Sequence, residues 1–164
     1  MSQWQEQYQR MKRARGRLNR EWNDGTEGED KTDRVRDAFF VFFQNCYHMV
    51  DWLENDPARP IRRAETDRFV KASPALSICE ALCQGSKHAV LKQKGITAVQ
   101  PERQVISELP FVDSSGKKLG GIQFSAMEMT VVWSAGQTNA FDLADECFAE
   151  WDQFLVSRGL VLPT

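Results

Sequence analysis

The sequence lacks a long hydrophobic run, and this absence argues against an integral membrane protein. None of its apolar stretches approaches the roughly 20 residues that a membrane-spanning helix needs. The start, MSQWQEQYQR, also lacks the apolar segment that is typical of a secretory signal. We therefore expect a cytoplasmic protein that does not act on a membrane.

A large excess of one charge is lacking as well. The 21 Lys and Arg residues nearly balance the 23 Asp and Glu residues, which gives a formal net charge of −2. This balance argues against a nucleic-acid binder that is basic throughout, although the basic residues are unevenly spread along the chain.

Motifs of several enzyme and metal-binding classes are also absent. The sequence has no Walker loop, GxGxxG, GxSxG or HExxH motif. Structural zinc sites usually use short spacings such as CxxC, which the chain lacks. The cysteines fall in predicted helices among apolar residues, where we expect reduced and buried thiols: Cys46, Cys79, Cys83 and Cys147. We therefore predict neither a bound metal nor a cofactor.

What remains is the composition of one globular domain, 1–164, with 41% hydrophobic and 27% charged residues. The periodicity of apolar residues predicts a mainly α fold, a bundle of four or five helices. A small antiparallel β-hairpin or meander is expected before the C-terminal helix, with Pro110 indicating an edge strand. The predicted segments are a basic helix at 2–22, an acidic loop at 23–31, central helices within 32–95, a β insertion at 104–134, a turn at 135–137 and a last helix at 138–158.

The longest helical signal covers 32–55, and its broad apolar side predicts a position in the middle of the bundle. A polar strip remains on this helix and includes Asn45, His48 and Asp51. His48 and Asp51 are three residues apart, so a hydrogen bond between them would orient the imidazole for proton transfer. The alternative is a solvated or locally satisfied pair on a partly exposed face.

A second candidate segment is Ser86-Lys87-His88, which follows Gly85. If the helix breaks at Gly85, Ser86 caps a new turn and places Lys87 and His88 at a helix N-terminus, which attracts anions. If the helix runs through Gly85, the glycine serves the close approach of another backbone. The alternative to an anion site is a solvated lysine beside a core histidine.

The first helix carries the densest cluster of positive charge. Six basic residues fall within eleven positions, and they are Arg10, Lys12, Arg13, Arg15, Arg17 and Arg20. Such a patch fits a phosphate backbone or another acidic surface. Alternatively it is a solvated face, or it pairs with acidic residues on the last helix.

Two strings, FFxxCYHMxDWL from Phe42 to Leu53 and CxxLCQGSKHxxL from Cys79 to Leu91, resemble a group of small prokaryotic helical proteins. That group is distantly similar to the HEPN (higher eukaryotes and prokaryotes nucleotide-binding) proteins. The resemblance implies an often dimeric helical bundle, and many such proteins are RNA-cleaving toxins or anti-phage effectors. Their signature is an Arg followed, after four to six residues, by His. In this sequence the matching positions hold Val41, Phe42 and Phe43 before His48, and Ala81, Leu82 and Cys83 before His88.

The combined hypothesis places His48 as a base or proton shuttle and Asp51 as its orienting group. Lys87, His88 and Ser86 would hold an anion, and Asn45 would add a directional hydrogen bond. The protein would then act on RNA or a nucleotide, which requires His48 and His88 to converge. The second hypothesis is a non-enzymatic interaction module, a homodimer or the partner of another protein, with structural histidines.

Overall fold

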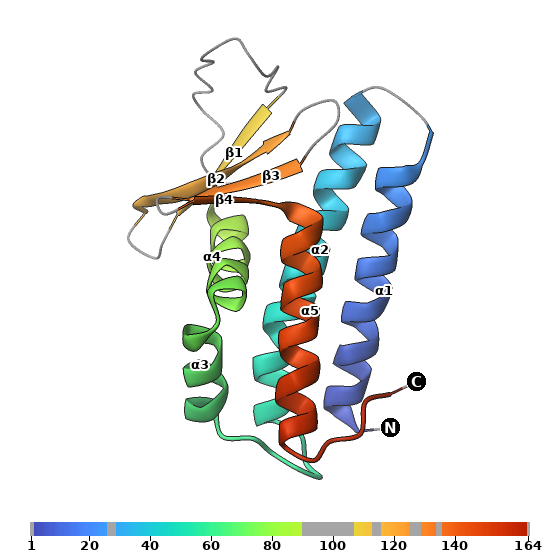
Figure 1. Ribbon diagram of the computed structural model, residues 1–164, viewed down its shortest axis with the longest axis vertical. Coiled ribbons are helices and arrows are strands. Elements are labelled where there is room, and N and C mark those ends of the chain that lie inside the picture. Colours follow the sequence, from blue (N-terminus) through green and yellow to red (C-terminus); the bar gives the residue numbers. More distant parts are fainter. Residues whose placement is uncertain are drawn as a thin grey trace.

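The structure is a computed structural model that describes residues 2–25, 29–89, 107–112, 116–124, 129–133 and 136–163 (Figure 1). These residues form a mainly helical bundle with a small antiparallel sheet before the C-terminal helix, as the sequence predicts. The helices are α1 Gln3–Asn23, α2 Glu29–Glu54, α3 Arg63–Ala72, α4 Pro74–Ala89 and α5 Ala140–Ser157. The strands are β1 Ser107–Val112, β2 Lys118–Phe124, β3 Met129–Trp133 and β4 Gly136–Asn139.

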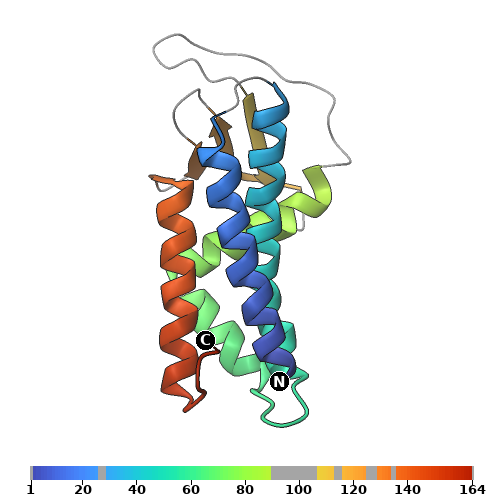
Figure 2. The same ribbon diagram turned by 90° about the vertical axis from the view of Figure 1, so that its right-hand side faces the viewer.

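Helix α2 is the centre of the bundle. It runs antiparallel to α1 and also packs on α3, α4 and α5 (Figures 1 and 2). Its apolar side is fully buried over several turns, including Phe39, Phe42 and Phe43, whose rings contact one another. Burial of three aromatic side chains stabilises the folded state by several kcal/mol, on the order of 2 kcal/mol for each ring. The prediction of a central helix with a broad apolar side is therefore confirmed.

The sheet covers one end of the bundle. Its strands follow one another in the order β1-β2-β3-β4, and each neighbouring pair is antiparallel. Ile122 of β2 pairs with Val131 of β3, and both are buried in the core. Helix α4 packs against β1, while β3 and β4 adjoin α5 (Figure 1). Strand β1 lies at an edge of the described sheet, in agreement with the position of Pro110.

Two boundaries differ from the predicted ones. Residues 136–139 form strand β4, although their glycine and polar residues predict a turn and the start of a helix. Strand β4 is short and polar, and it lies at the edge of the described sheet, where it pairs with β3. Its own residues therefore show no apolar alternation that would predict a strand. Asn139 then caps α5, because its Oδ1 accepts a hydrogen bond from the backbone N–H of Phe141 at 2.8 Å. Helix α2 starts at Glu29, before the predicted start at residue 32, so the acidic loop is shorter than predicted.

Helix α4 continues through Gly85 to Ala89. Of the two alternatives at this glycine, the structure therefore has the continuous helix, and Ser86-Lys87-His88 do not begin a new one. No helix within the described ranges is long and apolar enough to cross a membrane.

Candidate functional site

The polar strip of α2 is engaged largely in packing between helices. The Gln7 side-chain amide of α1 donates to the backbone oxygen of Asn45 at 2.7 Å and to its Oδ1 at 3.3 Å. The Asn45 side-chain amide in turn donates to the Val41 carbonyl at 2.7 Å. The Asn45 side-chain oxygen therefore helps to hold α1 and α2 together, while its amide nitrogen bonds within α2.

Asp51 is held by α3. Its Oδ1 accepts a hydrogen bond from the Arg63 guanidinium at 2.7 Å, and Arg63 also donates to Asp67 at 2.7 Å. The hydrogen bond with Asp67 is the main reason that the pKa of Arg63 is raised above its usual range. Among the residues that the structure describes, Asp51 makes no hydrogen bond with the half-buried His48. The carboxylate that was expected to orient His48 is thus an ion-pair partner of Arg63.

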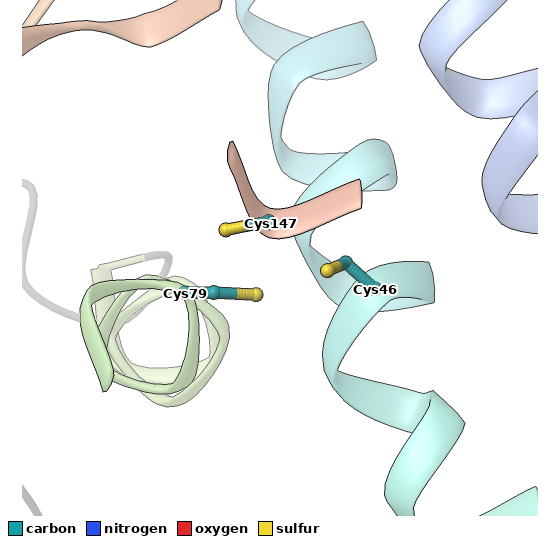
Figure 3. Close-up of side chains that lie close together, drawn as sticks. All are labelled: Cys46, Cys79 and Cys147. Carbon is teal, nitrogen blue, oxygen red and sulfur yellow. The ribbon is translucent and has the colours of Figure 1, made fainter. Parts of the chain in front are cut away.

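His48 lies on the side of α2 that faces away from α4. Cys46 faces α4, because its sulfur lies beside that of Cys79 (Figure 3). Two residues further along a helix correspond to a turn of about 200°, which places His48 on the opposite side from Cys46. The side chains of Ser86, Lys87 and His88 lie outside the described part of the structure. The convergence of His48 and His88 therefore remains a prediction, and the backbone of α2 does not favour it.

The basic residues of α1 are divided between two faces. On one face, Arg15 forms an ion pair with Asp145 of α5 at 2.7 Å. Nearby, the Tyr8 hydroxyl donates to Asp152 of α5 at 2.9 Å. Burial raises the pKa of Asp152, although the hydrogen bond from Tyr8 and the positive charge of Lys12 act to lower it. Of the alternatives left open for the basic helix, pairing with acidic residues of the last helix is therefore what the structure shows on this face.

The other face carries an arginine stripe, which consists of Arg10, Arg13, Arg17 and Arg20. Spacings of three, four and three residues place these side chains along one side of α1, pointing away from the core. All four residues are exposed. Arg10 pairs with Glu6 at 2.8 Å and lies 4.9 Å above the Trp52 ring of α2, while Arg17 is 3.8 Å from Glu21. Within the described ranges, Arg13 and Arg20 form no ion pair.

An open groove of about 460 Å³ lies between α3 and α5. Phe69 and Phe154 form its apolar part, with their rings stacked at 4.4 Å. Arg158 and Glu65 also line it and pair with each other at 2.9 Å. This mixed lining is typical of a shallow surface groove rather than of an enclosed substrate pocket.

The sequence analysis missed a cluster of three cysteines. Cys46 of α2, Cys79 of α4 and Cys147 of α5 point toward one another, and their sulfur atoms all lie within 4.8 Å of one another (Figure 3). All three residues are completely buried. The thiol of Cys79 donates to the Phe43 carbonyl and that of Cys147 to the Ala75 carbonyl, each at 3.4 Å. No short cysteine spacing in the sequence predicts this cluster, because each cysteine comes from a different helix.

The surroundings shift the pKa values of the three thiols in different directions. Burial, together with the neighbouring cysteines, raises the pKa of Cys79 and Cys147 well above the usual value. Burial also raises the pKa of Cys46, but the thiols of Cys147 and Cys79 and the indole N–H of Trp151 outweigh it and lower the pKa to about 5. The indole nitrogen of Trp151 is buried and makes no hydrogen bond to a described residue.

Comparisons with protein-family models, with curated proteins and with solved structures give no match. The class of the protein is therefore defined by its fold and its side chains alone. It is a helical bundle capped by a four-stranded antiparallel sheet, with an arginine stripe on α1 and a buried three-cysteine cluster in its core.

Proposed function

We propose that this protein binds nucleic acid, with RNA as the expected form, along the arginine stripe of α1. The observation that carries the proposal is the division of the basic residues on this helix. Arg15 is neutralised by Asp145, but Arg13 and Arg20 are exposed and have no acidic partner among the described residues. The phosphate-binding patch that the sequence predicts on the first helix is therefore reduced to the outer face of this helix.

A stripe of arginines suits a phosphate backbone for two reasons. A guanidinium is always charged and its planar fork of donors matches phosphate oxygens. Each neutralised phosphate also releases condensed counterions, so several arginines in a row give strong binding at low salt. Arg10 and Trp52 extend the stripe toward α2, where an aromatic ring offers a surface for a base of a single strand.

The proposed activity is binding rather than cleavage. Cleavage by His48 would need a group that orients its imidazole and a second group that holds the phosphate. Asp51 is occupied by Arg63, and Asn45 is occupied by Gln7 and Val41. The Arg that precedes His in the HEPN signature is also missing from this chain.

The test is fluorescence anisotropy with a labelled single-stranded RNA, measured over a range of salt concentrations. The variant combines Arg13→Gln, Arg17→Gln and Arg20→Gln. A matched control combines Arg62→Gln, Arg68→Gln and Lys71→Gln, which are also exposed and lie around α3, on the other side of the bundle from α1 (Figures 1 and 2). Each variant loses three positive charges, so an effect of net charge alone appears in both.

We expect the α1 variant to bind RNA at least about tenfold more weakly, and the control to bind it nearly as the wild type does. Loss of three phosphate contacts to a single strand should also reduce the slope of log K against log salt by about 2. Equal loss in the two variants, or no binding by the folded wild type at low salt, would overturn the proposal. A DNA strand of the same sequence shows whether the 2′-hydroxyl contributes to affinity.

A further inference from the structure

The three-cysteine cluster has the dimensions of a metal site. Because every pair of sulfur atoms lies within 4.8 Å, the three atoms fit within a circle whose radius is at most 4.8 Å divided by √3, so one point lies no further than about 2.8 Å from all three. Thiolate sulfur binds ions such as zinc at about 2.3 Å, so the sulfurs need to approach the centre by only about half an ångström. The three cysteines come from three helices that already pack against one another (Figure 3).

A second, independent feature points to negative charge in the same place. Trp151 of α5 is completely buried, and its indole N–H has no hydrogen-bond partner within the described structure. A buried donor without a partner destabilises the folded state, and native proteins seldom leave one. Trp151 follows Cys147 by four residues on α5, so its side chain lies on the same side of this helix as the cluster. A thiolate there would give this donor an acceptor, and a metal ion would offset the cost of its buried charge.

We propose that Cys46, Cys79 and Cys147 form a three-coordinate thiolate site for a soft metal ion, of which Cu(I) fits best. Thiolate ligands select Cu(I), zinc and iron–sulfur centres over hard ions. Structural zinc is almost always four-coordinate, and the described residues offer no fourth sulfur or nitrogen ligand at the cluster. The carbonyl oxygens of Phe43 and Ala75, which the thiols contact, are hard ligands that suit calcium or magnesium instead.

Binding involves no electron transfer. Each cysteine that becomes a thiolate ligand releases one proton to solvent, and the ion takes its place on the sulfur. Affinity for the ion therefore increases with pH until all the ligands are ionised. Because all three cysteines are completely buried, the ion enters only when the packing of α2, α4 and α5 opens locally. Uptake is therefore slower than diffusion.

The test is anaerobic titration of the reduced protein with Cu(I) against a chromophoric Cu(I) chelator. We expect one ion per chain, a thiolate-to-copper absorption band in the ultraviolet, and quenching of tryptophan fluorescence from Trp151. Cys46→Ala and Cys147→Ala each remove one ligand and should lower the affinity at least about tenfold. Cys83→Ala is the matched control, because Cys83 is also a buried cysteine of α4 but lies outside the cluster.

Trp151→Phe tests the role of the indole without removing a ligand. Loss of a group that hydrogen-bonds a metal ligand typically lowers the affinity for the metal about 10- to 100-fold, and the quenching should disappear in the same variant. If a variant that lacks a ligand fails to fold, thermal melting of the folded proteins gives the test instead. Cu(I) should then raise the Tm of the wild type and of Cys83→Ala.

Three results would overturn the proposal. The folded, reduced wild type fails to bind Cu(I), Cys46→Ala binds it as tightly as Cys83→Ala does, or Zn(II) competes with Cu(I) on equal terms. The third result would indicate a fourth ligand and a tetrahedral site.

Discussion

Asp56 Oδ2 accepts a hydrogen bond from the backbone N–H of Trp4 at 3.1 Å, across 52 residues of sequence. Its other oxygen accepts from the backbone N–H groups of Ala58 at 2.9 Å and Arg59 at 3.1 Å. Asp56 is only 1% exposed. One buried carboxylate therefore satisfies an N–H in the first turn of α1, which has no partner within its own helix, and also fixes the turn that follows α2.

We expect Asp56→Asn to lower the free energy of unfolding by about 2 kcal/mol. The amide keeps one acceptor oxygen but replaces the other with an NH₂ group, which then faces N–H donors. Urea unfolding followed by circular dichroism measures the change. Asp33→Asn is the control, because Asp33 is exposed and, among the described residues, pairs only with Arg36 across one turn of helix, so its loss should cost less than about 0.5 kcal/mol. Equal effects of the two substitutions would contradict the anchoring role of Asp56.

The same carboxylate gives a prediction about pH. Burial raises the pKa of Asp56, but the backbone N–H groups of Trp4, Arg59 and Ala58 outweigh this effect, so the pKa is lowered. A lowered folded-state pKa means that the stabilisation is present above the unfolded value of about 3.9 and is lost as the pH falls through the folded value. The difference in unfolding free energy between wild type and Asp56→Asn should therefore shrink below about pH 4. A difference that grows toward acidic pH would contradict a lowered pKa of Asp56 in the folded state.

The helices could be predicted from the sequence because apolar residues repeat strongly along them. The side of α2 with Phe39, Phe42 and Phe43 is a signal within one segment, and the structure buries all three residues. The polar strand β4 has no such signal in its own residues, because it forms a strand through its pairing with β3. The cysteine cluster could not be predicted, because it depends on how α2, α4 and α5 pack. The same limit applies to Asp51, whose partner Arg63 comes from another helix.

Tyr8→Phe tests the contact between α1 and α5. The substitution removes the hydroxyl that donates to Asp152 and should lower the free energy of unfolding by about 1 kcal/mol at pH 7. Burial raises the pKa of Asp152, while the hydrogen bond from Tyr8 lowers it. A raised pKa means that the ionised carboxylate costs stability above its folded value, and losing Tyr8 increases this cost. The deficit of Tyr8→Phe should therefore be largest at neutral pH and smaller at about pH 3, below the usual aspartate pKa.

Asp152→Asn is the companion variant for this contact. It retains an acceptor for Tyr8 and removes the partly buried charge, so its stability at pH 7 should at least equal that of the wild type. A large loss of stability in Asp152→Asn would show that the charge itself, through Lys12, holds the two helices together.

Trp52→Ala is expected to distinguish single-stranded from double-stranded ligands. The Trp52 ring lies beneath Arg10 at the end of the arginine stripe and is partly exposed. Stacking of an unpaired base on an aromatic ring contributes about 1–3 kcal/mol, whereas the bases of a duplex are not free to stack. Anisotropy titrations should therefore show a loss of about fivefold or more for a single-stranded RNA and little change for a duplex. Equal losses would indicate that Trp52 acts only by positioning Arg10.

His48→Ala separates binding from catalysis. The His48 side chain is half-buried and makes no hydrogen bond to another described residue, so the substitution should change the free energy of unfolding by less than about 1 kcal/mol. If the protein only binds RNA, gel analysis should show intact RNA after incubation with the wild type, with His48→Ala and with His88→Ala. RNA that is cut by the folded wild type and spared by both histidine variants would instead show that His48 and His88 act together. The site would then have to bring the two histidines together from different helices, although helical spacing from Cys46 places His48 on the side of α2 away from α4.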